Sequence, residues 1–250
     1  MDTALFSPSS LFGVSDSDSS DEEITETQQN FVERKHLFPE MELLIQEFTF
    51  HQMNANLLWP GTFAFAEWLV QHTSWLRGRR IIELGSGTGA LAIFLRKSFH
   101  VDITTSDYDD PDIEENIAHN CRANGVLHVL PHIRHSWGDV FPVADPDWDL
   151  IIASDILLYV KQYENLVKTL CFLLKSYKPK VNKTGSGTSE EKDICPLPRP
   201  AFLMSWRRRI GKEDESLFFT GCDKAGLEVN HLGSRVYCIT PKETSTIGEV

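Results

Sequence analysis

Gly85, Gly87 and Gly89 lie between a short apolar run at residues 80–84 and a helix-forming segment at residues 90–95. Glycine allows positive φ angles and a close approach of the backbone to a ligand, and N–H groups at the start of a helix attract anionic or polar groups. The spacing also satisfies the dinucleotide fingerprint G-x-G-x-x-G/A, with Ala90 in the last position. The segment therefore predicts a loop that binds a nucleotide cofactor.

Glu83 lies two residues before the first glycine, at the carboxyl end of the predicted strand. A carboxylate there would repel a pyrophosphate. It would attract S-adenosylmethionine, which carries a sulfonium and an α-amino group. We therefore expect the methyl donor and not NAD. In the alternative interpretation, Glu83 only caps or hydrates the turn.

A second β-rich run, at residues 101–106, ends in Asp107. This residue lies about 20 positions beyond the glycines, where α/β nucleotide-binding folds place a carboxylate on the ribose hydroxyls. Asp109 and Asp110 precede Pro111 and are alternatives with a different role, because either could cap a helix over residues 112–124. Asp107 comes first after the strand, so it is the predicted ribose ligand.

The chain resembles the family 16 class I methyltransferases, seven-strand enzymes that use S-adenosylmethionine and mostly methylate lysine in other proteins. Five segments carry the resemblance, in the order and at the spacing of that family, and the whole likeness extends over about residues 45–240. The segments are residues 58–62 (Leu-Trp-Pro-Gly-Thr), 83–89 (Glu-Leu-Gly-Ser-Gly-Thr-Gly), 105–107 (Thr-Ser-Asp), 136–139 (Ser-Trp-Gly-Asp) and 149–155 (Asp-Leu-Ile-Ile-Ala-Ser-Asp).

The resemblance implies roles for individual residues. Trp59 would border the methionine end of the cofactor and Trp137 the adenine, since an indole offers a flat apolar face to a purine or a cation. The remaining cofactor residues would be Gly85, Ser86 and Gly87 as the backbone cradle, Asp107 on the ribose, Ser154 as the pocket floor, and Glu83. Both tryptophans are also compatible with a purely structural place in the core.

The chain departs from the family after the fourth strand. Members commonly carry Asp-x-x-Tyr or Asp-x-x-Phe there, whereas this chain has Leu158 in the aromatic position and Tyr159 one place later. Asp155 matches the family and is the predicted residue that positions the acceptor amine, with Tyr159 as a second catalytic candidate. The alternative role of Asp155 is to cap the next helix. The lysine pocket is expected to differ from that of the family.

The elements that must position these residues alternate along the chain. Strands are predicted at residues 80–84, 101–106, 128–134, 148–153, 201–206, 227–232 and 235–239, with a further strand at 48–50 and helices at 63–76, 112–124 and about 161–175. The alternation predicts the α/β class, with a seven-strand Rossmann-like sheet that is mostly parallel and a C-terminal antiparallel hairpin. Ligands bind at the carboxyl ends of the strands in such sheets.

The chain has 250 residues and a net charge of −12, a length that suits one domain with extensions. Residues 1–30 contain seven acids and no Lys or Arg, so the remainder carries only −5. We expect a disordered acidic, serine-rich tail at 1–35, a methyltransferase domain at 36–250 and a flexible insertion at 176–200. The mildly acidic body offers no clear nucleic-acid surface beyond Arg207, Arg208 and Arg209.

Five cysteines are present without a C-x-x-C pair, which favours a reducing compartment. There is neither a signal-like N-terminus nor an apolar run of about 18 residues, and His128, His132 and His135 lack metal-ligand spacing. We expect a monomeric cytoplasmic or nuclear protein that binds neither a membrane nor a metal.

We therefore predict an S-adenosylmethionine-dependent methyltransferase that acts on a lysine side chain of a protein substrate. Two other classes remain open. A small-molecule methyltransferase would share every cofactor residue, and a cofactor-binding interaction protein would have kept the fold with little catalysis.

Overall fold

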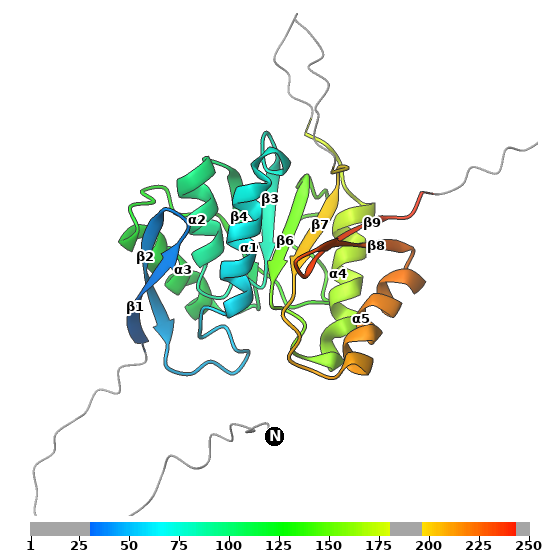
Figure 1. Ribbon diagram of the computed structural model, residues 1–250, viewed down its shortest axis with the longest axis horizontal. Coiled ribbons are helices and arrows are strands. Elements are labelled where there is room, and N and C mark those ends of the chain that lie inside the picture. The colour runs from blue at the N-terminus through cyan, green and yellow to red at the C-terminus, as the bar shows by residue number, and fades with distance from the viewer. Residues whose placement is uncertain (1–30, 181–196, 244–250) are drawn as a thin grey trace, which may run out of the picture.

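The computed structural model describes residues 31–180 and 197–243 (Figure 1). Seven strands form one sheet in the order β5-β4-β3-β6-β7-β9-β8. Their bounds are β3 Arg80–Leu84, β4 Asp102–Asp107, β5 His132–Arg134, β6 Leu150–Ser154, β7 Ala201–Ser205, β8 Leu227–Gly233 and β9 Val236–Pro241. The first five strands of the series run parallel, while β9 is antiparallel to both β7 and β8. The predicted α/β class, the mostly parallel sheet and the C-terminal hairpin are confirmed.

Helices cover both faces of the sheet (Figure 1). Alternate residues of one strand enter different cores: Ile81 packs with one cluster and Ile82 with the other. This alternation follows from the two-residue period of a strand and makes the central strands apolar on both sides. The first face carries α1 Pro60–Gln71, α2 Ala90–Phe99 and α3 Pro111–Ala123, and the second carries α4 Tyr163–Lys175 and α5 Lys212–Lys224. No helix in the described ranges is long and apolar enough to span a membrane.

Two predicted elements of the main fold differ from the structure by three or more residues at an end, and the others by at most two. Helix α1 begins at Pro60, three residues before the predicted start, and ends at Gln71, where the short 3₁₀ helix η2 Thr73–Trp75 follows. The fixed φ of proline suits the first helical position, and its missing N–H has no intrahelical partner there. The predicted strand at 128–134 is only β5, His132–Arg134, because Pro131 lacks the amide hydrogen that a ladder needs.

An N-terminal β-hairpin forms a second, two-stranded sheet that the sequence analysis missed. It consists of β1 Phe31–Phe38 and β2 Met41–Phe48 in antiparallel register. The strand predicted at 48–50 is wrong, since β2 ends at Phe48. The expected boundary of the tail at residue 35 falls inside β1, so the described fold starts at Phe31. Residues 1–30 and 181–196, which include most of the predicted tail and insertion, lie outside the described residues.

Asparagine side chains of α3 and of its C-cap residue, Asn124, hold the free edge of β2. Asn120 accepts a hydrogen bond from the N–H of Gln46 at 2.7 Å and donates to its carbonyl at 3.1 Å. Asn124 makes the same pair of bonds with Leu44, at 3.0 and 2.7 Å. Asn116 also donates to the carbonyl of Gln46. Positions four apart on a helix share one face, so these amides replace a neighbouring strand and satisfy the backbone of β2.

We expect Asn120→Ala to lower the free energy of unfolding by about 2 to 4 kcal/mol. The change leaves the N–H and carbonyl of Gln46 with fewer partners, and each buried group left unsatisfied costs about 1 to 3 kcal/mol. Asn120 is also fully buried and donates to the carbonyl of Thr88 in the glycine loop. Urea unfolding measures the loss, and Asn230→Ala on the exposed side of β8 is the control. Equal stability of the two variants would contradict this account.

Candidate active site

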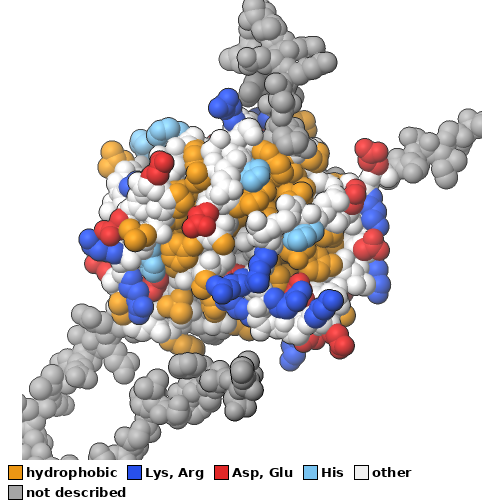
Figure 2. All heavy atoms as spheres, in the orientation of Figure 1, with side chains coloured by type: hydrophobic (Ala, Val, Ile, Leu, Met, Phe, Trp, Pro, Cys, Tyr) orange, Lys and Arg blue, Asp and Glu red, His pale blue; other side chains and the backbone are white. Residues whose placement is uncertain are grey.

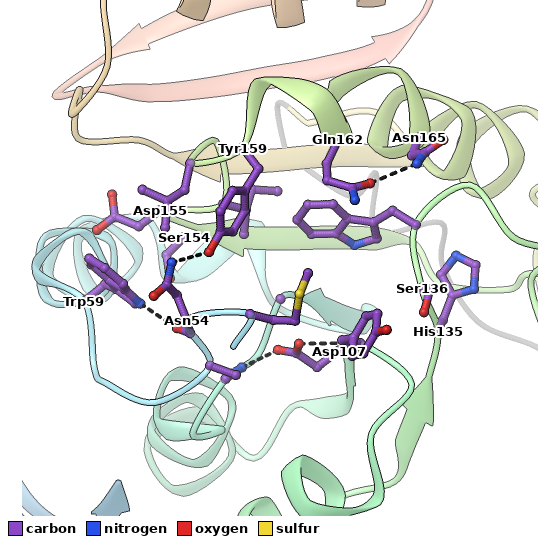
Figure 3. Close-up of a pocket in the computed structure, with 18 of the residues that line it drawn as sticks. Asn54, Trp59, Asp107, His135, Ser136, Ser154, Asp155, Tyr159, Gln162 and Asn165 are labelled. Atoms are coloured by element: carbon purple, nitrogen blue, oxygen red, sulfur yellow. Dashed lines mark hydrogen bonds between the residues drawn. The ribbon is translucent and has the colours of Figure 1, made fainter. Parts of the chain in front are cut away.

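A cavity of about 380 Å³ opens at the carboxyl ends of β3, β4 and β6 (Figure 3). It lies where the chain order of the sheet reverses between β3 and β6, the usual ligand position in an open α/β sheet. All five resemblance segments contribute residues to it, and of the predicted site residues only Ser86 and Glu83 are not part of its lining. The lining comprises Met53, Asn54, Ala55, Trp59, Gly85, Gly87, Asp107, Tyr108, His135, Ser136, Trp137, Asp139, Ser154, Asp155, Ile156, Leu158, Tyr159, Gln162 and Asn165.

The glycine loop needs its glycines for geometric reasons. Gly85 and Gly87 have φ of 64° and 52°, in the left-handed region. A Cβ on Gly85 would come within 2.8 Å of the Ile156 side chain, whereas a Cβ on Gly87 would meet no protein atom closer than 3.9 Å. Because Gly87 lines the cavity, that open space is available to a ligand. Ser86 is buried and does not line the cavity. Its hydroxyl donates to the carbonyls of Glu83 and Ser106 and so fixes the loop.

Asp107 connects β4 to the glycine loop. Its carboxylate accepts the N–H of Gly87 at 2.6 Å and the N–H of Tyr108 at 2.7 Å, and it lines the cavity. Burial raises the pKa of this carboxyl group, while the two backbone bonds oppose the shift. Asp110 caps α3 through the N–H of Asp112, so the capping role falls to a different acid. Asp107 therefore presents a fixed carboxylate to the cavity, and its role as the ribose ligand stays a prediction.

Glu83 lies beneath the glycine loop and is not among the residues that line the cavity. Its side chain is buried, and its Oε2 atom has no hydrogen-bond partner in the described part of the chain. Burial, reinforced by the nearby Asp107, raises the pKa of Glu83 to about 8, against bonds from the Ala92 N–H and the Ser86 hydroxyl. Two buried acids thus lie close together under the loop. A cation above them would relieve their electrostatic cost.

This raised pKa predicts a pH-dependent stability. Between the ordinary pKa of 4.5 and about 8, the folded state keeps a proton that the unfolded chain releases. The contribution of protonated Glu83 to the free energy of unfolding is therefore complete below about pH 4.5. It is lost as pH rises towards 8, by at most about 1.4 kcal/mol per pH unit. Glu83→Gln should remove this slope. Denaturant titrations from pH 5 to 8 measure the free energy of unfolding of wild type and Glu83→Gln. Glu67→Gln, which changes an exposed acid of α1, is the control. The same pH dependence in wild type and Glu83→Gln would refute the role of Glu83.

The far end of the cavity is formed by the segment that follows β5. His135 donates its backbone N–H to the carbonyl of Asp107 at 2.8 Å, and its ring lies 3.1 Å from the hydroxyl of Thr169 on α4. The same hydroxyl accepts the N–H of Gly138 at 3.0 Å. These bonds fix both ends of a short turn that carries Trp137. The indole of Trp137 packs against the second core and lines the cavity, and its contact with adenine stays a prediction.

The opposite end is built by the segment that joins the hairpin to α1. Glu47 of β2, which is buried, accepts the N–H of Leu58 at 3.3 Å and contacts His36 at 2.8 Å. Next to Leu58, the indole N–H of Trp59 donates to the carbonyl of Asn54 at 3.2 Å. The docked hairpin therefore positions this wall of the cavity. The sequence analysis had no signal for the wall residues Met53, Asn54 and Ala55, because their role depends on a hairpin that it missed.

Asp155 is fully buried at the end of β6 and has a left-handed φ of 54°. Its carboxylate accepts the N–H of Gly61 at 2.7 Å and the N–H of Arg207 at 3.0 Å. It also forms an ion pair with Arg209 at 2.6 Å. A Cβ on Gly61 would lie 2.4 Å from this carboxylate, which explains the glycine after Pro60. Asp155 does not cap the next helix, since Tyr159 precedes the 3₁₀ helix η3 Val160–Gln162.

Leu158 and Tyr159 both face the cavity. Tyr159 is partly exposed, and its hydroxyl contacts the side-chain amide of Asn54 across the opening (Figure 3). The tyrosine thus supplies an aromatic wall from one place later in the chain than the family pattern. Gln162 and Asn165, joined by a 2.9 Å bond, complete the same side. Figure 3 shows Trp59 and Asp155 at one end of the cavity and His135 and Ser136 at the other.

Comparison with known proteins identifies relatives of this arrangement. The family described as lysine methyltransferase matches residues 37–184. A histone-arginine methyltransferase, METTL23 of Xenopus laevis, is 30% identical over 120 residues, which are 47% of this chain and 51% of the relative. A protein N-terminal and lysine N-methyltransferase, efm7 of Aspergillus fumigatus, is 26% identical over 52% of this chain and 55% of its own. The chain thus spans about half the length of these curated relatives.

Solved structures share the fold at low sequence identity. The 16S rRNA methyltransferase RsmC of T. thermophilus, solved with AdoMet and guanosine, superposes with a TM-score of 0.55 at 14% identity and covers 85% of this chain and 51% of its own. A Methanococcus maripaludis protein of the S-adenosyl-L-methionine-dependent methyltransferase class gives 0.51 at 15% identity, over 75% of this chain and 87% of its own. At these identities the likeness concerns the fold alone.

Proposed function

Because the chain belongs to the lysine methyltransferase family, we propose that it transfers a methyl group from S-adenosylmethionine to a lysine side chain of another protein. The observation that carries the proposal is one cavity in which Gly87, Asp107 and Asp155 meet. The first two suit a nucleoside, and the third offers a buried carboxylate to a cationic acceptor. The names of the relatives, which specify protein acceptors, support the same class of substrate.

The residues present fit the cofactor. The open space above Gly87 admits a ligand against the backbone, and Asp107 offers carboxylate oxygens to vicinal hydroxyls. The carboxylate of Asp107 places a negative charge beside the loop, which favours an ammonium or sulfonium over a pyrophosphate. Glu83, whose pKa is raised to about 8 and whose Oε2 has no hydrogen-bond partner among the described residues, would ionise more readily once such a cation is bound nearby. Trp137 provides an apolar face for a purine. Trp59 lies at the other end, where the resemblance places the methionine portion.

Bound S-adenosylmethionine supplies a methyl group on a sulfonium, which a neutral amine can accept. A free lysine has a pKa near 10.4, so losing its proton at neutral pH costs about 4 to 5 kcal/mol. In this proposal Asp155 orients the acceptor nitrogen and Tyr159 forms the wall beside it. Most of the rate gain then comes from alignment in a desolvated site, which can supply about 7 to 11 kcal/mol. No covalent nucleophile of the protein takes part.

The experiment that tests this function uses purified protein, methyl-labelled S-adenosylmethionine and a cell lysate separated afterwards into proteins and small molecules. We expect label in protein, on lysine after hydrolysis to amino acids. Label confined to small molecules would replace the proposal with a small-molecule methyltransferase. Label on arginine would keep the protein acceptor and change its residue. Cofactor binding without any transfer would indicate an interaction protein.

We also propose that the protein acts as a monomer in the cytoplasm or nucleus, without nucleic acid as substrate. The support is the cysteine usage and the mildly acidic body of the chain. Cys121, Cys171, Cys222 and Cys238 are free thiols in the structure. Burial raises the pKa of all four thiols, so none of them is activated as a thiolate.

A further inference from the structure

At the acceptor end of the cavity, Asp155 and Trp59 form a site suited to a cation, and the side chain of Arg209 occupies it. The guanidinium of Arg209 donates to Asp155 at 2.6 Å and lies over the indole of Trp59, with its central carbon 4.3 Å from the ring centroid. A carboxylate combined with an aromatic face is the chemistry that binds an ammonium or guanidinium group. Asp155 and Trp59 both line the cavity, so this cation site opens on the proposed reaction centre.

Of the two terminal nitrogens of Arg209, Nη2 donates to Asp155. Its Nη1 atom is buried and has no hydrogen-bond partner in the part of the chain that the structure describes. Burial lowers the pKa of Arg209, and the neighbouring Arg207 lowers it further, while Asp155 opposes the shift. The side chain retains 21% of its exposure, so solvent reaches it. An unsatisfied buried donor carries a desolvation cost, which leaves the guanidinium less firmly bound than its ion pair suggests.

The surface outside this site is basic. Figure 2 shows Lys and Arg side chains gathered in the lower middle of the view, where Figure 1 places the carboxyl ends of β6 and β7. Arg207 and Arg208 are exposed beside Arg209. The charge of Arg207 opposes that of Arg209 and so weakens the hold of Asp155 on it, whereas Arg208 forms an ion pair with Glu215.

The carboxylate does not depend on Arg209 for its position. The backbone N–H groups of Gly61 and Arg207 hold Asp155 from two other elements, and Asn54 anchors Trp59 through the indole N–H. If Arg209 turns out towards solvent, the two cation-binding surfaces stay in place. The site then has room for a side-chain cation that comes from the cavity.

We propose that Arg209 is an internal competitor of the acceptor side chain, and that Asp155 and Trp59 form the acceptor subsite that Arg209 occupies until a primary ammonium or guanidinium group displaces it. This inference rests on the proposed function for the identity of the acceptor. Competition reduces the apparent affinity for the acceptor by the fraction of molecules whose subsite is free. Arg209 thereby sets how strongly a substrate must bind elsewhere before its target side chain enters.

The test measures binding of butylammonium and methylguanidinium to the full chain by calorimetry, without any methyl transfer. In Arg209→Gln both probes should bind about tenfold more tightly than in wild type, because the competing cation is gone. Arg209→Lys keeps a charge but loses the flat contact with Trp59, so it should bind the probes with intermediate affinity. Asp155→Asn in the Arg209→Gln background should abolish the gain. The ratio of the two probe affinities indicates whether the subsite favours lysine or arginine.

Lys212→Gln is the matched control, since it removes one positive charge from an exposed position at the start of α5. Its probe affinity should equal that of wild type. Equal probe affinities in wild type, Arg209→Gln and Arg209→Lys would overturn the inference, because the probes would then bind without using the surface that Arg209 occupies. If Arg209→Gln does not fold, the Arg209→Lys comparison decides alone. A lysate assay without protein methylation would refute the proposed function while leaving a positive probe result intact.

Discussion

Asp107→Ala should weaken the binding of S-adenosylmethionine by about 10²- to 10⁴-fold. Two charge-assisted bonds to vicinal hydroxyls are lost, each worth about 1.5 to 3 kcal/mol. The variant also releases the N–H of Gly87, which Asp107 holds at 2.6 Å, so the loop loses its preorganised shape. S-adenosylhomocysteine has the same ribose and no sulfonium. Calorimetry should therefore show a similar loss for both ligands.

Asp109→Ala is the matched control for this loss. Asp109 lies two residues further along, is exposed, and forms an ion pair with Arg134 at 3.5 Å on the surface. The Asp109→Ala substitution removes the same charge as Asp107→Ala without changing the cavity lining. Unchanged affinity in Asp107→Ala, or an equal loss in Asp109→Ala, would show that the ribose is held elsewhere. Tight binding of NAD to the wild type would contradict the cofactor itself.

The cofactor side of this site was predictable because its signals are local. A strand, a glycine-rich turn and a helix start lie within fifteen residues, and their backbone requirements restrict the residue types directly. The same holds for Asp107, which follows its strand at the expected distance. Glu83 shows the limit of such reasoning. Its charge was recognised, but its burial beneath the loop depends on the packing of α2 and on Asp107.

The acceptor side was less predictable because it depends on contacts between distant segments. Asn54 and Trp59 are positioned by a hairpin whose edge is satisfied by amides of α3, about 75 residues later in the chain. Arg209 meets Asp155 across 54 positions. No propensity or spacing rule indicates such pairs. A run of three arginines after β7 was visible in the sequence, yet only the fold shows that the third of them turns inward over an indole.

Tyr159 illustrates an intermediate case. The sequence placed it one position away from the family aromatic, which raised the question of whether the pocket lacks that group. In the fold the loop after β6 begins with the left-handed Asp155 and continues into η3, so Tyr159 faces the cavity together with Leu158. A shift of one residue is tolerated in a loop, because no regular periodicity fixes which side each residue faces.

The other large effect is expected for Asp155→Asn, which should reduce turnover on a protein substrate by about 10²-fold or more with little change in cofactor affinity. Lost orientation of the acceptor acts on the transition state and not on cofactor binding. Steady-state kinetics on the methylated lysate fraction and calorimetry with S-adenosylmethionine measure the two quantities. Glu164→Gln, an exposed acid in the first turn of α4, is the control. Full activity of Asp155→Asn would rule out the orienting role.

A loss of activity in Asp155→Asn has two explanations, since the carboxylate contacts Arg209 as well as the proposed acceptor. A double-mutant cycle separates them. If Asp155 served only to hold Arg209, its substitution in an Arg209→Gln background would cost nothing further. If Asp155 orients the acceptor, the same substitution should cost the full factor of about 10², and Arg209→Gln should no longer improve acceptor binding once Asp155 is gone. Melting temperatures of all four proteins check the fold, because in either background an asparagine at position 155 has one acceptor oxygen for the two backbone N–H groups of Gly61 and Arg207.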